Sequence, residues 1–364
     1  MAKLTVACVG DVMCGDQFNQ IGWGTASKIE QYGKDFVDPR IVAILKSHDI
    51  VLANVECVLS DCERDIKQAR SLHMRGRPES AVRIKEWGIN AVNLANNHIL
   101  EHGSLPAEDT VNNLKKNGII VTGIDDNGKF NNSPSWTEMI INGQTIAIYG
   151  FCLRDEKYAY YYREDILSLC RQIQQRRKSG DIVIISVHWG DELIDRPSLQ
   201  QRNVADQLLD AGATLVAGHH PHVVQGLRKR EGCLVAYSLG NFIFDSWCNH
   251  TSWSIVLSLQ IDNQKIINYR TIPIVRSRDY RPVLAEDEIY EKLVREIDRR
   301  NQLVQDVLVD GSSYQRVYDS EVRRLNCQDR IQLWLRIAMF FWKVSPRYWR
   351  GIFARPILRR LGKW

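Results

Sequence analysis

At 364 residues the chain is long enough to bury a large core, as one large domain or two. Its 44% hydrophobic and 25% charged residues are typical of a soluble globular protein, and its nine cysteines form no Cys-x-x-Cys pair, which argues against a zinc finger or an iron–sulfur site. The net charge of +5 is uneven, because residues 1–329 carry 39 basic and 43 acidic side chains whereas residues 330–364 carry nine basic and no acidic ones.

The N-terminal stretch has the composition of a first β-strand. Residues Lys3–Val9 are rich in β-forming side chains. Their apolar run, Leu4–Val9, has six residues, too few for the core of a signal peptide or for a membrane span. Scattered cysteines in an odd number also suit a reducing compartment. We therefore expect a cytoplasmic protein with no signal peptide and no transmembrane helix.

Polar side chains follow the first two predicted strands. Asp11 comes just after the first strand, where many α/β proteins present a carboxylate. A second strand is predicted at Asp49–Val55, and Asn54 and Glu56 alternate with an apolar residue at its end, so that both face the same way. The alternative is the polar edge of a turn without a functional role.

A third strand ends in two carboxamides and an imidazole. Strand Asn90–Leu94 is followed by Asn96, Asn97 and His98. Groups of this kind are costly to leave unsatisfied, so they need partners such as a metal, a phosphate or the backbone. Earlier in the chain, Arg75 stands in the segment HMRGRPES and is a candidate anion clamp. A solvated arginine is the alternative.

The remaining pattern alternates helices with strands. The pair Asn142-Gly143 joins two such strands and predicts a hairpin with a type I′ turn. Strand Ile182–Val187 delivers His188 at its end. The other predicted helices are Pro39–Ser47, Glu79–Trp87, Pro106–Asn117, Ile166–Lys178 and Gln200–Ala211, and the other predicted strands are Ile119–Thr122, Trp136–Ile141, Gln144–Tyr149, Leu234–Tyr237, Ser254–Ile261 and Lys265–Val275.

The segment 214–226, TLVAGHHPHVVQG, places three histidines in four positions after an apolar run. Pro221 argues against a helix here. On an extended backbone His220 and His222 would project from the same face and hold one ion or two adjacent ions. Imidazole is the commonest side-chain metal ligand. The alternative is a histidine-rich turn that only caps a strand.

Five predicted strand ends therefore carry side chains of the kind that bind metals, and we expect them to meet at one edge of a sheet. Carboxylates, carboxamides and imidazoles without thiolates suit Mn²⁺, Fe, Zn²⁺ or Mg²⁺, as one or two ions in a hydrolytic site. In chain order the groups are Asp11, Asn54 with Glu56, Asn97 with His98, His188, and His220 with His222.

Six sequence blocks, GDVMCG, NVEC, NLANNHILEHG, VHWGDE, DAGATLVAGHHPHVVQG and YSLGNFIFD, occur in this order between about residues 3 and 275. They resemble the blocks of the poly-γ-glutamate capsule synthesis proteins of CapA type, a branch of the calcineurin-like metallophosphatases. The resemblance implies an α/β fold: a sandwich of two mixed β-sheets flanked by helices, with the metal site at the sheet edge. We expect this domain to span residues 1–285, followed by a helical extension at 286–329.

The resemblance also implies roles for single residues. Asp11 and Asn97 would serve catalysis, and His98 would protonate or stabilise the leaving oxygen. Arg75 and Asn241 are predicted to contact an anionic substrate, since a guanidinium can form a bidentate contact with a carboxylate or a phosphate. The implied ligands of one or two divalent ions are Asp11, Glu56, Asn97, His188, His220 and His222.

Three features depart from the patterns of related proteins. Most metallophosphatases have Asp-x-His in the first block, whereas Met13 stands here at the third position, a loss that the capsule branch shares. Asp16 stands where the capsule proteins usually have arginine, and Glu101-His102 where they tend to have Asp-Tyr. These proteins also commonly begin with a membrane anchor, whereas we expect none here.

Two functions fit these observations. The first is a metal-dependent phosphoesterase-like protein in the biosynthesis of an anionic surface polymer such as poly-γ-glutamate. The second is a non-catalytic, membrane-associated subunit of a polymer synthesis or export complex, with membrane proteins as its partners. The loss of the histidine at position 13 and the basic tail favour the second.

The basic tail, residues 330–364, is predicted to bind an anionic membrane surface without spanning it. Its uncharged run Ile337–Trp342 has six residues, against about 20 for a spanning helix. Four of the ten tryptophans lie here among nine basic residues, the composition of interfacial segments. Each basic residue near an anionic leaflet contributes about 1 kcal/mol. A helix packed on the core is one alternative, and single-stranded nucleic acid, which we do not expect as a partner, is another.

Overall fold

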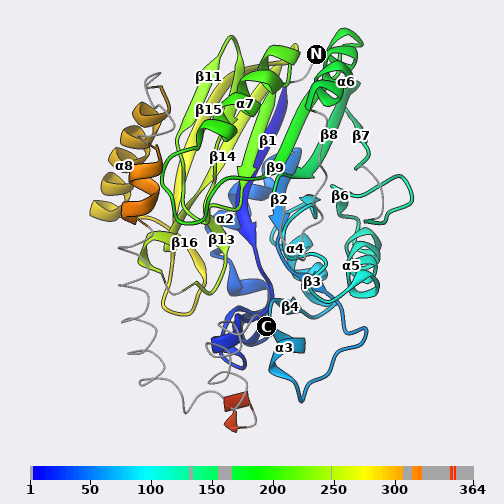
Figure 1. Cartoon of the computed structure of the whole chain (residues 1–364), viewed down its shortest axis with the longest axis vertical. Helices are drawn as coiled ribbons and strands as arrows, with labels where there is room; N and C mark the ends of the chain where they lie inside the picture. The colour runs from blue at the N-terminus through cyan, green and yellow to red at the C-terminus, as the bar shows by residue number, and fades with distance from the viewer. Residues whose placement is uncertain are drawn as a thin grey trace.

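The computed structural model of the protein describes residues 3–130, 134–154, 166–246, 248–305, 314–321, 345–346 and 348–349. Two β-sheets form its centre (Figure 1). Within these residues the larger sheet has eight strands in the order β16-β15-β14-β1-β2-β5-β6, with β13 paired to β1. The strands are β1 (Leu4–Val12), β2 (Ile50–Val55), β5 (Ala91–Asn93), β6 (Ile120–Thr122), β13 (Asn241–Ile243), β14 (Trp253–Asp262), β15 (Lys265–Arg276) and β16 (Pro282–Leu284).

The smaller sheet has six strands in the described part of the chain, in the order β11-β12-β10-β9-β8-β7. They are β7 (Thr137–Ile141), β8 (Gln144–Cys152), β9 (Ile182–His188), β10 (Leu215–His219), β11 (Leu227–Arg230) and β12 (Cys233–Ala236). Both sheets mix parallel and antiparallel pairs. A short parallel pair, β3 (Val58–Leu59) with β4 (Arg75–Gly76), lies outside them.

The alternation of apolar side chains along β1 explains how the sheets stack. Leu4 and Val6 pack between the two sheets, in one cluster with Ile184 and Leu215 of the smaller sheet. Val9 belongs to a different cluster, on the opposite face of β1. Successive side chains of a strand point to opposite faces, so a strand with apolar side chains on both faces must be covered on both sides.

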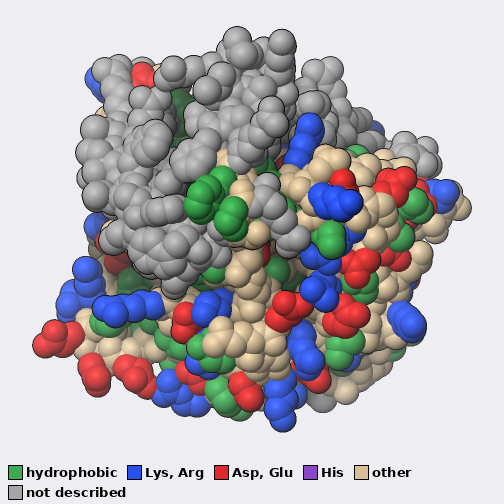
Figure 2. All heavy atoms as spheres, turned by 90° about the horizontal axis from the view of Figure 1, so that it is seen from below, with side chains coloured by type: hydrophobic (Ala, Val, Ile, Leu, Met, Phe, Trp, Pro, Cys, Tyr) green, Lys and Arg blue, Asp and Glu red, His purple; other side chains and the backbone are tan. Residues whose placement is uncertain are grey.

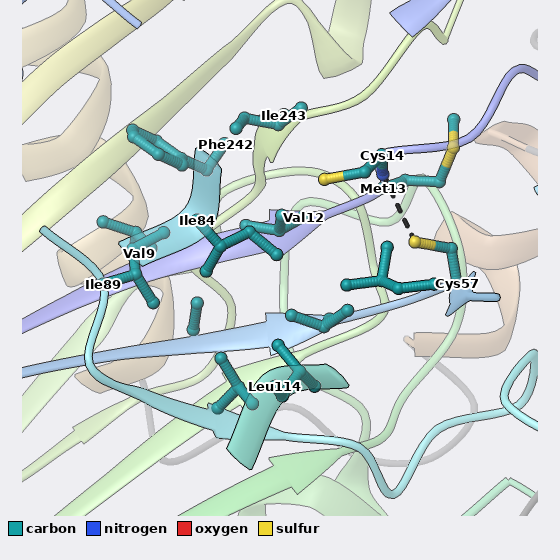
Figure 3. Close-up of a cluster of buried hydrophobic side chains, with 14 of the residues drawn as sticks. Val9, Val12, Met13, Cys14, Cys57, Ile84, Ile89, Leu114, Phe242 and Ile243 are labelled. Carbon is teal, nitrogen blue, oxygen red and sulfur yellow. Dashed lines mark hydrogen bonds between the residues drawn. The ribbon is translucent and has the colours of Figure 1, made fainter. Parts of the chain in front are cut away.

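Helices supply that cover. On the larger sheet, Val9 and Val12 of β1 pack with Ile84 of α4 and Leu114 of α5 (Figure 3), while α6 and α7 pack on the outer face of the smaller sheet. The helices are α1 (Thr25–Tyr32), α2 (Pro39–Lys46), α3 (Ala69–Leu72), α4 (Ser80–Glu86), α5 (Ser104–Lys116), α6 (Ile166–Lys178), α7 (Leu199–Ala211) and α8 (Asp287–Gln305), with short 3-10 turns at Phe18–Gln20, Gly33–Phe36 and Asn249–Thr251. The predicted α/β sandwich of two mixed sheets flanked by helices is therefore confirmed.

Helices also follow the sandwich, as predicted. Helix α8 buries Leu293 and Ile297 and packs against β11 and β15, and residues 314–321 are helical too. Arg300 of α8 donates a hydrogen bond to the carbonyl of Val224, so this helix supports the loop that follows the histidine cluster. The domain boundaries proposed at residues 285 and 329 stay predictions.

The basic tail lies mostly outside the described residues. Of residues 330–364, the structure describes 345, 346, 348 and 349. Tyr348 is buried against Phe18 and Ile21, and its hydroxyl donates to the carbonyl of Ile66 at 2.7 Å. Nowhere in the described part of the chain is a helix both long and apolar enough to cross a bilayer. Membrane-surface binding by the tail stays a prediction.

On the face seen from below, the described basic and acidic side chains are interspersed rather than separated (Figure 2).

The first strand is longer than expected. It continues through Asp11 to Val12 instead of ending at Val9, because Asp11 pairs with Asn54 of β2 on one side and Asn241 of β13 on the other. A register shift between Cys8 and Asp11 accommodates this change of neighbours. The hairpin at 142–143 is confirmed, with φ angles of 53° and 76°.

Two buried carboxylates hold the start of α1. Asp16 accepts hydrogen bonds from the backbone N–H of Gly22 and Ala26, and Asp245 accepts from those of Gln17 and Thr25. Burial raises the pKa of Asp245 to about 8, and the charge of Asp16 adds to the rise. An acid whose pKa is raised by folding stabilises the fold fully below its unfolded pKa and loses that contribution as pH rises through the folded pKa.

Replacing Asp245 with asparagine tests whether ionisation of the buried Asp245 carboxyl group destabilises the fold as pH rises. The second carboxylate oxygen of Asp245 has no hydrogen-bond partner, so an amide can keep the two accepted bonds and stay neutral. We expect the melting temperature of the wild type to fall between pH 5 and pH 8.5 relative to that of Asp245→Asn. Parallel melting curves for the two proteins over this range would refute the buried-carboxylate assignment.

Candidate metal centre

The two sheets bring their strand ends to one place. Asp11 of β1 lies opposite Asn54 of β2 in the larger sheet, and His188 of β9 lies opposite His219 of β10 in the smaller one. These strands run parallel within each sheet, so their carboxyl ends share an edge. All of these side chains are buried, although each is polar. Buried polar groups need partners.

The histidine segment corrects one expectation. His220 and His222 are not on extended backbone, because β10 ends at His219 and the two residues have φ angles of +93° and +58°. Positive φ is uncommon outside glycine and concentrates at functional sites. The turn still directs the two imidazoles to the same place, with ring centroids 5.8 Å apart.

Glu56 lies at the centre of the cluster. Its Oε1 atom is 3.8 Å from His188 Nε2, 3.8 Å from His222 Nε2 and 3.9 Å from His98 Nε2. On the other side of the site, Asp11 Oδ2 is 3.3 Å from His222 Nδ1. These groups come from strand ends far apart in the sequence, and the fold places them within one small volume.

Unpartnered ligand atoms test whether the cluster fits a metal ion. Glu56 Oε1 and both ring nitrogens of His220 are buried without a hydrogen-bond partner. Glu56 with His188 and His220, and Glu56 with Asp11 and His222, form groups whose ligand atoms all lie within 4.8 Å of one another. Two ligands at 2.0–2.2 Å from one ion are at most about 4.4 Å apart. The donor set therefore fits a divalent ion after small adjustments.

The protonation of the cluster agrees with a ligand role. Burial lowers the pKa of His188 and of His220 well below the usual value, which leaves both imidazoles neutral, the form that binds metals. Burial would also lower the pKa of His222, but the neighbouring Glu56 and Asp11 raise it to about 10. A cation bound between these groups would displace that proton.

Carboxamides orient the ligand-type side chains. Asn241 Oδ1 accepts from His222 Nδ1 at 2.9 Å, which leaves Nε2 facing Glu56. Asn54 Nδ2 donates to Asp11 Oδ1 at 2.9 Å, and Asn97 Oδ1 lies 2.9 Å from His188 Nε2. Partners of this kind fix ring orientation around metal sites. Asn241 was predicted to bind substrate; the structure places it beside His222, and the substrate role stays a prediction.

Three sequence blocks interlock behind the histidines. Trp189 donates its indole N–H to the carbonyl of Tyr237 at 2.9 Å, and the two rings stack. A Cβ atom on Gly218 would lie 2.1 Å from the Tyr237 carbonyl oxygen and 2.6 Å from the Trp189 indole nitrogen. Only glycine fits this contact, so the position of the histidine turn is set by close packing.

His98 lies at the edge of the cluster, and it has a partner, Glu101, that the sequence pattern alone did not assign. Its Nδ1 is 3.0 Å from Glu101 Oε2, while its Nε2 faces Glu56 at 3.9 Å. Burial alone would raise the pKa of Glu101, but the hydrogen bond to His98 and the neighbouring imidazoles lower this pKa to about 2. The Glu101 carboxylate therefore stays ionised. A carboxylate on one ring nitrogen leaves the other to exchange a proton at the site.

Met13 contributes nothing to the cluster. It is fully buried and packs with the apolar side chains on the outer face of β1. Figure 3 shows it beside Cys14 and Cys57, where the backbone N–H of Cys14 donates to the Cys57 sulfur at 3.3 Å. Position 13 therefore offers no ligand to the cluster.

Three further side chains join the site. His219 Nδ1 is 3.3 Å from Asp11 Oδ1, and Glu192 groups with His220 and His222. Arg154 follows β8 at the same sheet edge, donates to the Gly190 carbonyl at 2.7 Å and contributes its charge to the low pKa of His220. No sequence motif pointed to Arg154. Its place directly after a strand of the smaller sheet was the available signal.

Arg75, the predicted anion clamp, is not in bulk solvent. Its side chain is 3% exposed and donates to the Cys62 carbonyl at 2.9 Å. It contributes to the low pKa of His102, after the larger effect of burial. Contact with substrate stays a prediction for this residue.

Comparisons with known proteins agree with these blocks. The family model described as bacterial capsule synthesis protein PGA_cap matches residues 5–246. The chain is 27% identical to the capsule biosynthesis protein CapA of Bacillus anthracis, over 82% of this chain and 74% of that protein, and 27% identical to the PGA biosynthesis protein CapA of Bacillus subtilis, over 81% and 78%. A solved phosphatase from Mycoplasma pneumoniae is similar with 16% identity and a TM-score of 0.48, over 80% of this chain and 97% of that one. The family model matches about two thirds of the chain, which shows that this protein belongs to the bacterial capsule synthesis family, PGA_cap.

Proposed function

We propose that the protein is a metal-dependent phosphoesterase that serves the synthesis of an anionic surface polymer such as poly-γ-glutamate. The observation that carries the proposal is the set of buried, unpartnered ligand atoms of Glu56 and His220, surrounded by Asp11, His188 and His222. The names of the two Bacillus relatives, a capsule and a PGA biosynthesis protein, support the choice of polymer in this proposal. Anionic substrates suit a site with Arg154 at its edge.

Each residue has a distinct task in this proposal. A divalent ion held by Glu56, Asp11 and the histidines would supply Lewis-acid activation of water and of a phosphoryl oxygen. Asn54 holds Asp11 in place through its amide. His98 carries a proton on Nε2 toward the leaving oxygen, because Glu101 accepts from Nδ1 and fixes the ring.

The direct test is hydrolysis of an aryl phosphate by the full-length protein. We expect turnover after the addition of Mn²⁺ or Zn²⁺ and none after treatment with a chelator. Turnover that is equal with metal and with chelator would show that the proposed chemistry is wrong. A trace of contaminating phosphatase is excluded by the variants that follow, prepared in the same way.

Replacing His98 with glutamine is expected to lower kcat by about 100- to 10,000-fold, the usual contribution of a general acid. Bound metal should stay unchanged, because His98 lies at the edge of the ligand group and not within it. His48→Gln is the matched control, since His48 bonds to Ile44 and Ser258 away from the site. Equal activity of the two variants would remove His98 from the mechanism.

A non-catalytic subunit of a polymer synthesis complex is the second candidate. The observation that favours it is Met13, which leaves the first block without its histidine. This candidate predicts that a His220→Ala protein still supports polymer synthesis in cells that lack the wild-type protein. The phosphoesterase proposal predicts that it does not.

A further inference from the structure

A second cavity lies outside the metal centre. It has a volume of about 710 Å³, and α1, α3, β4, α4 and the residues near them form its walls. This volume is within the range of roughly 300 to 1,000 Å³ found for small-molecule sites. The residues of the metal centre do not line it. Four arginines do: Arg64, Arg75, Arg77 and Arg83.

Arg75 differs from the other three in having no carboxylate partner. Arg64 pairs with Asp61, Arg77 with Glu30 and Arg83 with Glu86, at 2.6, 2.9 and 2.5 Å. Among the described residues, Arg75 makes no ion pair.

The Arg75 side chain is also almost fully buried. It is 3% exposed, and its Nε–H has no acceptor. Burial, together with the charge of Arg64, lowers its pKa. Asp61 and Glu63 lie near enough to favour its charge, but neither forms an ion pair with it among the described residues. A buried cation without a direct ion pair is costly, and an anionic ligand in contact with it reduces that cost.

The β3–β4 pair joins a wall of the cavity to the chain segment that follows Glu56. Val58 of β3 lies opposite Arg75, and Val58 is two residues after Glu56.

We propose that this cavity binds a carboxylate-bearing organic polyanion, with the Arg75 guanidinium forming a bidentate contact with one of its carboxylates. The volume is far larger than an inorganic anion needs. Its walls also include apolar side chains, among them Ile29, Ile66 and Leu72, which suit the carbon chain of an organic ligand. The choice of this polymer as the ligand class rests on the proposed function. Binding of the polymer in the cavity does not require that the protein hydrolyse a phosphoester.

Isothermal titration of the full-length protein with a γ-linked glutamate oligomer, in the presence of a chelator, tests the assignment. We expect binding by the wild type and a roughly 10- to 100-fold weaker affinity for Arg75→Gln, the loss that removal of a charge-assisted hydrogen bond produces. Arg40→Gln, on a surface where Arg40 pairs with Asp38, should bind like the wild type.

Three outcomes would overturn the assignment. They are no binding by the wild type, equal affinity of Arg75→Gln and the wild type, and displacement of the oligomer by inorganic phosphate at equal affinity, which would indicate a simple anion site. If Arg75→Gln fails to fold by circular dichroism, Arg64→Gln replaces it, because Arg64 Nε is buried without an acceptor on the same wall and its loss should also weaken binding. Absent turnover with intact oligomer binding would contradict only the phosphoesterase proposal.

Discussion

Replacing His220 with alanine is expected to abolish metal-dependent phosphatase activity. His220 is fully buried, its two ring nitrogens have no hydrogen-bond partner, and it belongs to groups with Glu56 and with His222. The loss in kcat/KM should exceed the roughly 10- to 100-fold decrease that follows removal of a residue that only supports a ligand. The measurement is aryl phosphate hydrolysis at saturating Mn²⁺ or Zn²⁺.

A stability control separates this effect from unfolding. His220→Gln keeps most of the side-chain volume, so it should melt closer to the wild type than His220→Ala does and still be inactive. His48→Gln again reports the effect of losing an imidazole elsewhere. Activity of either His220 variant within about threefold of the wild type would contradict the ligand role.

Replacing Gly10 with alanine is expected to cost about 3 kcal/mol or more of unfolding free energy, as overpacking of a rigid contact does. A Cβ atom on Gly10 would lie 1.8 Å from the carbonyl oxygen of Gly240, so β1 and β13 would have to separate. That contact holds Asp11 beside Asn241, because the Asp11 N–H donates to the same carbonyl at 2.9 Å. Activity should fall together with stability.

Gly180→Ala is the matched control. Gly180 has a φ of +92° and nothing within 4 Å of the added Cβ, so its cost is limited to backbone strain of about 1 kcal/mol. Urea unfolding of the three proteins measures the difference. Equal midpoints for Gly10→Ala and Gly180→Ala would show that the close contact between β1 and β13 is not rigid.

The sequence predicted most helices and strands, and it predicted candidate ligands that the structure brings close together. Helix Ile166–Lys178 has the predicted bounds, and most strands differ by one to three residues. The reason is that parallel strands buried on both faces form continuous apolar runs, which are easy to recognise. Polar residues directly after such runs, among them Asp11, Glu56 and His188, stand out for the same reason.

Long-range packing explains what the sequence did not reveal. The positive φ angles of His220 and His222 depend on the turn around Pro221 and on the contact of Gly218 with Tyr237. Among the described residues Arg75 forms no direct ion pair, which depends on how the fold places the acids around it, and no local pattern encodes that. The same holds for Glu101, whose role follows from its distance to His98.

Metal binding by the full-length protein tests the central claim most directly. After removal of metal with a chelator, equilibrium dialysis against Mn²⁺ or Zn²⁺ followed by elemental analysis should give one or two bound ions per chain. The Glu56→Ala protein should bind fewer, because Glu56 belongs to both buried groups that surround the site. Absence of bound metal in the wild type, or equal binding by wild type and Glu56→Ala, would contradict the account.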